Sequence, residues 1–261
     1  MSVRRLLASA IAEVAAAVAP RRQKTLGLRI LMYHAVGTLL GPQYDPLGIY
    51  SIDLQLFERQ MELLSGLADG RIVDLNGAIP SSETLQVCVT FDDGYKDNLY
   101  AAAPIMQKHT IPFTVFVTTE YARSGCPEFM TPAELKELAQ YPGATIGTHG
   151  VSHVPLASCA DTALRNEVRE SKHYLEDLLG KPVTALSYPH GSVDGRVRAA
   201  AADAGYALGA CSHFNINKPG RDPFMLCRSV IRSDDSERIF LQKLHGHWDW
   251  YRWVSKDPVK L

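Results

Sequence analysis

A repeated alternation of apolar, β-type runs with segments of helical periodicity constrains this chain more than any other feature. The β-type runs are residues 29–36, 87–91, 113–118, 144–148, 185–188, 206–210 and 227–231. Between them, apolar residues recur at the i, i+3, i+4 spacing of an amphipathic helix. Strand–helix alternation favours an α/β fold with a parallel sheet and helices outside it. About seven parallel strands are enough to close such a sheet into a barrel.

Capping signals set the ends of two predicted helices. Thr131, Pro132 and Glu134 form a capping box at the start of one helix. Gly180 ends a long helix whose apolar face runs from residue 164 to residue 179. Further helices are predicted from residues 54–64, 197–204 and 236–244. No linker, internal repeat or low-complexity tract interrupts residues 26–261, which are therefore predicted to form one domain.

Residues 1–25 form a separate N-terminal segment, for which two interpretations stay open. Arg4 and Arg5 precede an apolar run that ends near Ala17-Val18-Ala19, as in a weak secretory signal. Against this, Glu13 interrupts the run, and large residues recur at helical spacing (Leu7, Ile11, Val14, Val18). We favour an amphipathic helix within residues 1–20, which either lies peripherally on a membrane or packs on the domain.

The net charge and the cysteine content limit which partners and which cellular compartment are expected. The formal net charge is −1, and we find no basic stripe, so nucleic acid is not expected as a partner. The five cysteines are scattered and form no CxxC pair, which favours a reducing compartment. We therefore expect a cytoplasmic protein, in contact with the inner membrane face if the N-terminal helix binds lipid; secretion or a periplasmic location is less favoured.

Polar residues gather where predicted strands end. They are His34, Asp92, Asp93, His149, His190 and Arg228. In parallel barrels the catalytic groups lie at the carboxyl ends of the strands, so these side chains are expected to meet in one site.

Two clusters at these strand ends suggest a metal site. In TFDDGY (residues 90–95), adjacent carboxylates repel one another unless a cation is present, although Asp-Gly is also a common turn signal. In THGVSH (residues 148–153), His149 and His153 share one face if the segment is a helical turn; otherwise they are ordinary histidines after a strand. Two imidazoles and one carboxylate make an open catalytic metal site.

The order and spacing of these two motifs resemble those of the NodB-like polysaccharide deacetylases, carbohydrate esterase family four. LMYHAV (residues 31–36) and SYPHG (residues 187–191) also resemble this family, and the resemblance covers residues 29–250. It implies a distorted (β/α) barrel and a divalent transition metal, with Zn²⁺ expected first and Co²⁺ or Ni²⁺ next. It also implies removal of N-acetyl groups from amino sugars of a glycan or glycolipid.

The resemblance also implies a role for each matching residue. Asp92 corresponds to the general base, and Asp93, His149 and His153 correspond to the metal ligands. The SYPHG turn would supply a backbone N–H to the oxyanion. The candidates for substrate binding are His34, Tyr188, Pro189, His190 and Gly191.

The chain departs from the family pattern at two points. The arginine that orients the base in many members is missing from SYPHG; Arg228 either replaces it or forms an ordinary ion pair. The general acid is expected at His245 or His247, with His190 and His213 as weaker candidates. The alternative for residues 244–250 is a packing element that contains Trp248 and Trp250.

Three functions remain open at this stage. The first is N-deacetylation of a polysaccharide or of its precursor, which is lipid-linked if the N-terminal helix binds a membrane. The second is hydrolysis of another C–N bond, in a formamido sugar or a cyclic imide. The third is non-catalytic carbohydrate binding, which is disfavoured because both aspartates and both histidines are present.

Overall fold

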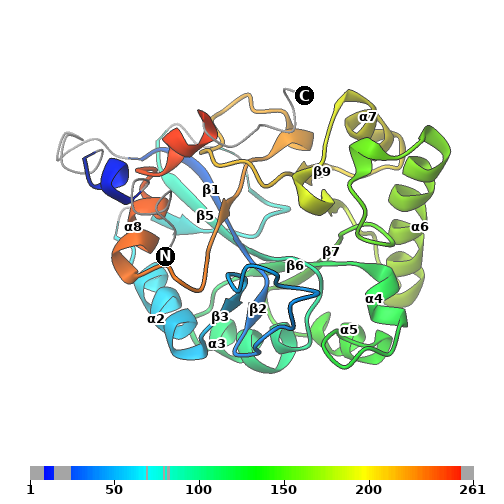
Figure 1. Ribbon diagram of the computed structural model, residues 1–261, viewed down its shortest axis with the longest axis horizontal. Helices are drawn as coiled ribbons and strands as arrows, with labels where there is room; N and C mark the ends of the chain where they lie inside the picture. Colours follow the sequence, from blue (N-terminus) through cyan, green and yellow to red (C-terminus); the bar gives the residue numbers. More distant parts are fainter. Residues whose placement is uncertain (1–8, 15–24, 69, 79, 81–82, 254–261) are drawn as a thin grey trace.

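A curled sheet of parallel strands forms the centre of the computed structural model, which describes residues 9–14, 25–68, 70–78, 80 and 83–253. Seven strands follow one another in the order β10-β1-β5-β6-β7-β8-β9. They are β1 (Gly27–Tyr33), β5 (Leu85–Phe91), β6 (Phe113–Val117), β7 (Ala144–Thr148), β8 (Ala185–Ser187), β9 (Leu208–Ala210) and β10 (Ser229–Val230). With helices outside the sheet, this is the predicted distorted (β/α) barrel (Figure 1).

One short strand extends the sheet, and a narrow seam closes it. β4 (Gly70–Ile72) is an additional strand that pairs with the first half of β5, while β6 pairs with its second half. A single parallel bridge, Ala210↔Leu226, links the end of β9 to the segment that leads into β10. Residues 226–230 therefore contact both β9 and β1 and close the sheet.

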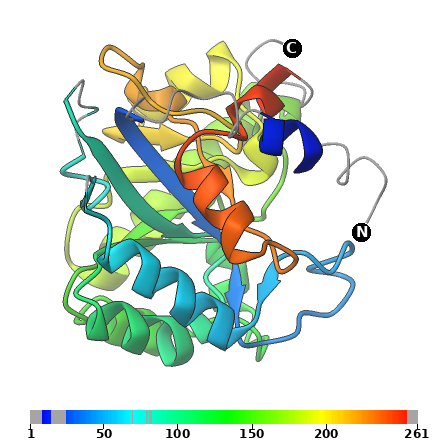
Figure 2. The ribbon, with the colours of Figure 1, turned by 90° about the vertical axis from the view of Figure 1, so that its left-hand side faces the viewer.

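The helices cover the outer side of the sheet. They are α2 (Leu54–Ser65), α3 (Ala103–Lys108), α4 (Thr119–Arg123), α5 (Pro132–Leu138), α6 (Asp161–Leu179), α7 (Gly195–Asp203) and α8 (Glu237–Leu244). The predicted capping box at Thr131 and Glu134 is confirmed, and Gly180 ends α6 with a φ of 66°. Figure 2 shows α2 and α8 lying over β1 and β5, where Phe57 and Phe240 are fully buried. Shorter helical turns connect these elements: η1 (Asn98–Ala102), η2 (Leu156–Ser158), η3 (Pro189–Gly191), η4 (Pro223–Met225) and η5 (Asp249–Trp253).

The first strand is shorter than its sequence predicts. Residues 29–36 are uniformly apolar apart from Arg29 and His34, yet β1 ends at Tyr33. The chain then leaves the sheet, and β2 (Ala35–Val36) pairs with β3 (Ser51–Ile52) as a separate two-stranded ribbon. His34 lies between β1 and β2, at this change of direction, so its side chain does not follow the alternation of side chains along β1.

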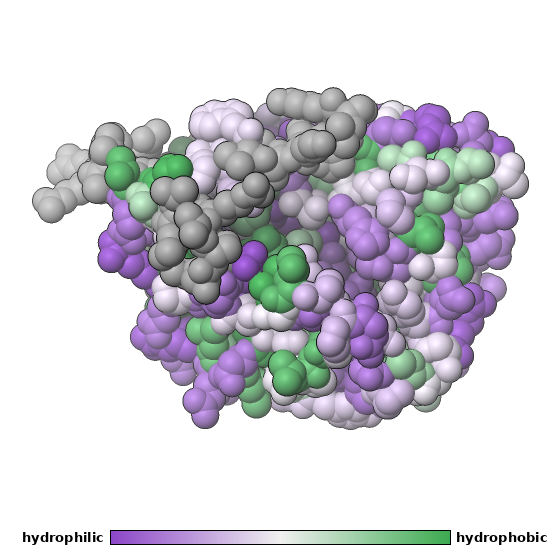
Figure 3. Space-filling view, in the orientation of Figure 1, coloured by the Kyte–Doolittle hydropathy of each residue, from purple (hydrophilic) through white to green (hydrophobic). Residues whose placement is uncertain are grey.

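The described part of the N-terminal segment, residues 9–14, is helical and lies against the domain. Ala12 is buried with Phe214 and Trp248, and Glu13 forms an ion pair with Arg238. Ile11 and Val14 are exposed, and hydrophobic atoms are visible on this stretch at the upper left of Figure 3. The other residues of the predicted apolar face, Leu7 and Val18, lie outside the described residues. Within the residues that are described, no helix is long and apolar enough to cross a membrane.

Candidate metal and catalytic site

The carboxyl ends of the strands surround a cavity of about 420 Å³. Most of the predicted site residues line it: His34, Asp92, Asp93, His149, His153, Tyr188, His190, Gly191 and Arg228. Pro189 is buried within the short turn η3 beside the cavity. The structure thus brings together residues from the ends of β1, β5, β7 and β8 and from the segment before β10, as parallel topology requires.

Asp93, His149 and His153 form the one group of side chains with metal-ligand geometry among the described residues. The Asp93 Oδ1 atom lies 3.5 Å from His149 Nε2 and 3.3 Å from His153 Nε2. This Oδ1 atom is buried and accepts no hydrogen bond of ordinary geometry. A buried carboxylate oxygen without a donor is costly unless a cation neutralises it. The donor set therefore fits a divalent transition metal.

The two histidines reach this point through a loop, and the helical turn suggested by their spacing is wrong. β7 ends at Thr148, and no helical residue occurs before Leu156. Gly150 has a φ of 74° and His153 a φ of 58°, and these left-handed residues fold the segment back toward Asp93. His149 and His153 therefore come together through the left-handed backbone of this loop and not through helical periodicity.

Burial and hydrogen bonding prepare His149 for metal binding. Its Nδ1 lies 2.9 Å from the carbonyl oxygen of Ser187, which fixes the proton on Nδ1 and leaves Nε2 free to coordinate. Burial lowers the pKa of His149 to about 4, against the opposing effect of the nearby aspartates. The imidazole is therefore neutral near pH 7, which is the form that binds a metal.

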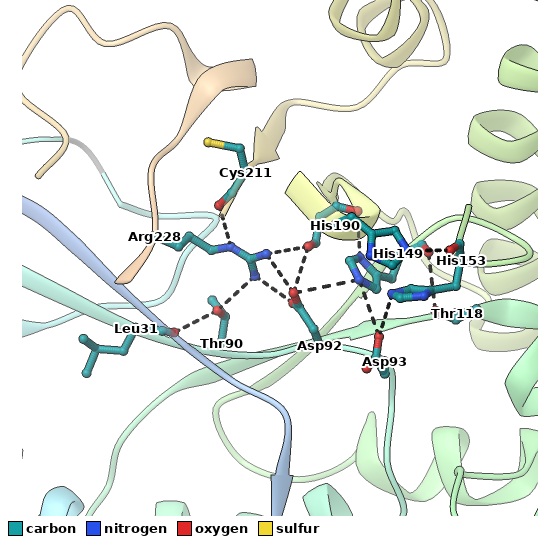
Figure 4. A network of polar contacts seen from close by, with 11 residues as sticks. Leu31, Thr90, Asp92, Asp93, Thr118, His149, His153, His190, Cys211 and Arg228 are labelled. Atoms are coloured by element: carbon teal, nitrogen blue, oxygen red, sulfur yellow. Dashed lines mark hydrogen bonds and ion pairs between the residues drawn. The ribbon is translucent and has the colours of Figure 1, made fainter. Parts of the chain in front are cut away.

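Asp92 forms a buried bidentate ion pair with Arg228. The distances from Arg228 Nη1 to Asp92 Oδ1 and from Nη2 to Oδ2 are both 2.7 Å (Figure 4). The guanidinium also donates to the Ser187 hydroxyl at 2.7 Å and to the Cys211 carbonyl at 3.0 Å. Burial alone would raise the pKa of Asp92, but Arg228, together with His149 and His34, outweighs burial and holds that pKa below its ordinary value. Arg228 thus lies where the sequence suggested a substitute for the missing arginine.

His34 contributes a further imidazole to the cavity. Its ring lies 4.2 Å from the ring of Tyr50, and its carbonyl accepts a hydrogen bond from Asn98. The Nδ1 atom is buried without a hydrogen-bond partner. Burial lowers the pKa of His34, although Asp93 and Asp92 lie close enough to oppose this effect.

The structure separates His245 and His247 from this cavity, so the predicted place of the general acid is corrected. Both residues line another depression, next to α8. The carbonyl of His245 accepts a hydrogen bond from Thr25, which precedes β1, so this segment lies at the amino end of the strand. The physical reason is that α8 runs back along the barrel. Trp248 is buried here and packs with Ala12, as the packing alternative proposed.

Of the two weaker candidates for the acid, His190 lines the cavity. Its ring lies 4.5 Å from that of His153, and its Nε2 lies 3.2 Å from the His153 carbonyl oxygen. His213 is buried, and its carbonyl accepts the backbone N–H of Arg228.

An aromatic wall of the cavity was not predicted from the sequence. Tyr44 and Tyr121 line the cavity and contact Phe129, with ring centroids 5.1 Å and 4.3 Å apart from it. Tyr44 belongs to a segment without periodicity, between β2 and β3, so no sequence pattern indicated that it would reach the site. The tyrosines and prolines of this segment are the only feature of its composition that could have drawn attention to it.

Comparisons with known proteins agree with this site. The profile of the family described as "Polysaccharide deacetylase" matches residues 81–209, which include both metal motifs. YxkH of Bacillus subtilis, which is itself assigned to the polysaccharide deacetylases, is 31% identical; the match covers 72% of this chain and 66% of YxkH.

Solved structures share the fold. The deacetylase PplD of Streptococcus pyogenes, determined with acetate, has 25% identity and a TM-score of 0.73 and matches 84% of this chain and 99% of its own. IcaB of Ammonifex degensii, at 22% identity and a TM-score of 0.70, matches 86% of this chain and 98% of its own and supports the fold alone. On the matching profile, the relative and the shared fold, the chain belongs to the NodB-like polysaccharide deacetylase family, carbohydrate esterase family four.

Proposed function

We propose that this protein is a metal-dependent hydrolase that removes N-acetyl groups from amino sugars of a polysaccharide or of its precursor. The observation that carries the proposal is the position of the Asp92–Arg228 pair beside Asp93, His149 and His153. PplD, which shares this fold, is a deacetylase whose structure holds acetate. The same arrangement would serve a formamido sugar or a cyclic imide, so substrate scope is part of the test.

Asp93, His149 and His153 would hold the metal, with Zn²⁺ expected first and Co²⁺ or Ni²⁺ as alternatives. Such an ion lowers the pKa of water and polarises a carbonyl oxygen. Asp92 is ionised and fixed by Arg228, so its carboxylate is available to take a proton from the attacking water. The bidentate contact prevents the carboxylate from rotating, which keeps the proton transfer in one geometry.

His34 is the residue that we propose as general acid toward the departing amine. It lines the cavity from the β1 side, and its Nδ1 atom is buried without a hydrogen-bond partner. Burial lowers the pKa of His34, but the charges of Asp93 and Asp92 oppose this effect and favour the protonated ring that a general acid requires. His245 and His247 lie at the other end of β1 and cannot reach an amide held at Asp93. The Tyr44–Tyr121 wall offers flat apolar surface for a sugar ring.

We also propose that the enzyme works in the cytoplasm, at a membrane surface. Ile11 and Val14 are exposed on a short helix that Glu13 and Ala12 hold against the domain. A membrane-facing role for this helix would bring a lipid-linked glycan to a cytoplasmic enzyme.

Acetate release from N-acetylated amino-sugar oligomers tests the activity. Purified protein with Zn²⁺ or Co²⁺ is compared with Asp92→Asn and His149→Ala, and with His247→Ala as a histidine variant outside the cavity. We expect metal-dependent release in the wild type and in His247→Ala, and loss in the other two. Metal binding without acetate release would redirect the search to formyl, imide or lipid-linked substrates. A protein that binds no metal would instead support the carbohydrate-binding alternative.

A further inference from the structure

The loop that carries His153 has no regular secondary structure that would fix its conformation. Residues 149–153 lie outside any helix or strand, and Gly150 and His153 both adopt left-handed φ values. His153 is also the least buried of the three candidate ligands, with a side chain 22% exposed against 3% for His149. His149 Nδ1 is fixed by the Ser187 carbonyl, whereas the His153 ring, within the part of the chain that the structure describes, packs against the rings of His190 and Tyr121 and approaches Asp93 without such a backbone hydrogen bond. Its position therefore depends on the backbone on either side of it.

A carboxylate from another element binds that backbone. Glu167, on α6, accepts hydrogen bonds from the N–H groups of Val151 at 2.7 Å and Ser152 at 3.1 Å. Its second oxygen accepts a short hydrogen bond from the Ser152 hydroxyl. The carboxylate also lies against Gly150, where an added Cβ would come within 3.0 Å of Glu167 Oε2. Three donors of one tight loop thus converge on one side chain.

The opposite side of the same loop is bound by α4. The N–H of Thr119 donates to the Gly150 carbonyl at 3.2 Å, and the N–H of Glu120 donates to the Val151 carbonyl at 2.9 Å. These N–H groups belong to the first turn of a helix and have no partner within it. The loop is therefore held between α4 and α6. Two other side chains contact carbonyls of this loop: His190 Nε2 lies 3.2 Å from the His153 carbonyl, and the Thr118 hydroxyl donates to the His149 carbonyl at 3.4 Å. Glu167 is the side chain that binds the N–H groups of Val151 and Ser152.

We propose that Glu167 is a positioning residue for the metal site: it fixes the 150–152 loop so that His153 Nε2 is directed at Asp93 Oδ1. Glu167 contacts no reacting atom and acts through His153. The inference rests on the proposed metal site, since a positioned ligand requires a metal to bind. Partners that orient metal ligands typically change metal affinity about 10- to 100-fold when they are removed.

Zinc affinity, measured by competition with a chromophoric chelator, tests this role together with the Tm of the metal-free protein. We expect Glu167→Ala to weaken zinc binding about 10- to 100-fold. Glu167→Gln should restore most of the affinity, because its amide oxygen accepts the two N–H groups and its NH₂ donates to the Ser152 hydroxyl. The matched control is Glu170→Ala, an exposed glutamate on the same helix, which should leave zinc affinity unchanged.

A second set of variants separates positioning from general stability. In a His153→Ala background, Glu167→Ala should cause no further loss of zinc affinity, because the ligand that it positions is already missing. Ser152→Ala removes one of the three contacts without touching α6 and should lower the affinity by a smaller factor. This variant also keeps the test valid if Glu167→Ala does not fold.

The outcomes are distinguishable. If the wild type binds no zinc, the proposed function fails and this inference fails with it. If the wild type binds zinc and Glu167→Ala binds equally well, with or without a lower Tm, only the inference is overturned. An equal loss of affinity in the wild-type and His153→Ala backgrounds would also overturn it, because Glu167 would then act elsewhere.

Discussion

Replacing Arg228 by methionine should destabilise the protein strongly, and removing the charge of Asp92 should reverse most of that effect. The two side chains are 1% and 4% exposed and share two hydrogen bonds of 2.7 Å. Arg228→Met leaves a buried carboxylate without its cation, which costs about 3–5 kcal/mol. For a domain of this size, each kcal/mol lowers Tm by about 2–4 °C, so the expected decrease is about 6–20 °C.

The assay is thermal or urea unfolding in the presence of a chelator, so that bound metal does not contribute to the free energy of unfolding. Arg228→Met/Asp92→Asn should recover about half or more of the loss, because neither buried charge remains. The matched control is Arg59→Met, which breaks the two ion pairs of the 50% exposed Arg59 with Glu62 and Glu237, and should cost less than about 1 kcal/mol. Both variants at Arg228 should lose acetate release, since an oriented base is worth about 10²- to 10⁴-fold.

Two results would refute this reasoning. A loss below about 1 kcal/mol for Arg228→Met would mean that water or a neighbouring group replaces the guanidinium. A double variant no more stable than Arg228→Met would mean that the cost arises from lost packing of the long side chain and not from the unpaired charge.

Three further predictions concern pH, the acid and the membrane. Burial raises the pKa of Asp97 to about 7, so the folded state keeps a proton that an unfolded aspartate releases near pH 4. The free energy of unfolding should therefore fall by about 4 kcal/mol as the pH rises from about 4 to about 7. Urea titrations across this range should show a flatter pH profile for Asp97→Asn. His34→Gln should lower kcat about 10²- to 10⁴-fold without loss of zinc binding, whereas His245→Gln should leave both unchanged; unaltered kcat in His34→Gln would exclude it as the acid. Full-length protein should co-sediment with anionic vesicles more than a form that begins at residue 21, and equal recovery in the supernatant would remove the membrane proposal.

The pattern of the sequence predicted the parts of the fold that depend on local periodicity. β7 and the N-terminal cap of α5 appear where they were expected, because a short apolar run and a capping box are both encoded by neighbouring residues. The π-helical turn at Asn98–Ala102 and the short α4 were missed. α4 has only five residues, too few to develop an amphipathic period, and the π-helical turn, which runs directly into α3, departs from the 3.6-residue period on which the prediction relied.

The candidate site was predictable where its residues follow strands and not where the chain returns from a distance. Asp93 and His149 were found because parallel strands place their carboxyl ends together. His245 was expected at the site and does not lie there, because residue spacing gives no sign that α8 runs back and carries His245 to the amino end of β1. The contact of Glu167 with Ser152 had no sequence signal either, since an acidic residue on a helix usually faces solvent.

The seam between β9 and β10 carries Arg228, so the order in which the chain is synthesised determines when Asp92 can gain its partner. Asp92 precedes its partner Arg228 by 136 residues, and Arg228 lies on the last segment to join the sheet. A ribosome-bound chain that has exposed β5 through β9 therefore carries the Asp92 carboxylate without its guanidinium, next to Asp93. The Asp92–Arg228 pair can therefore form only after the final part of the domain has left the ribosome.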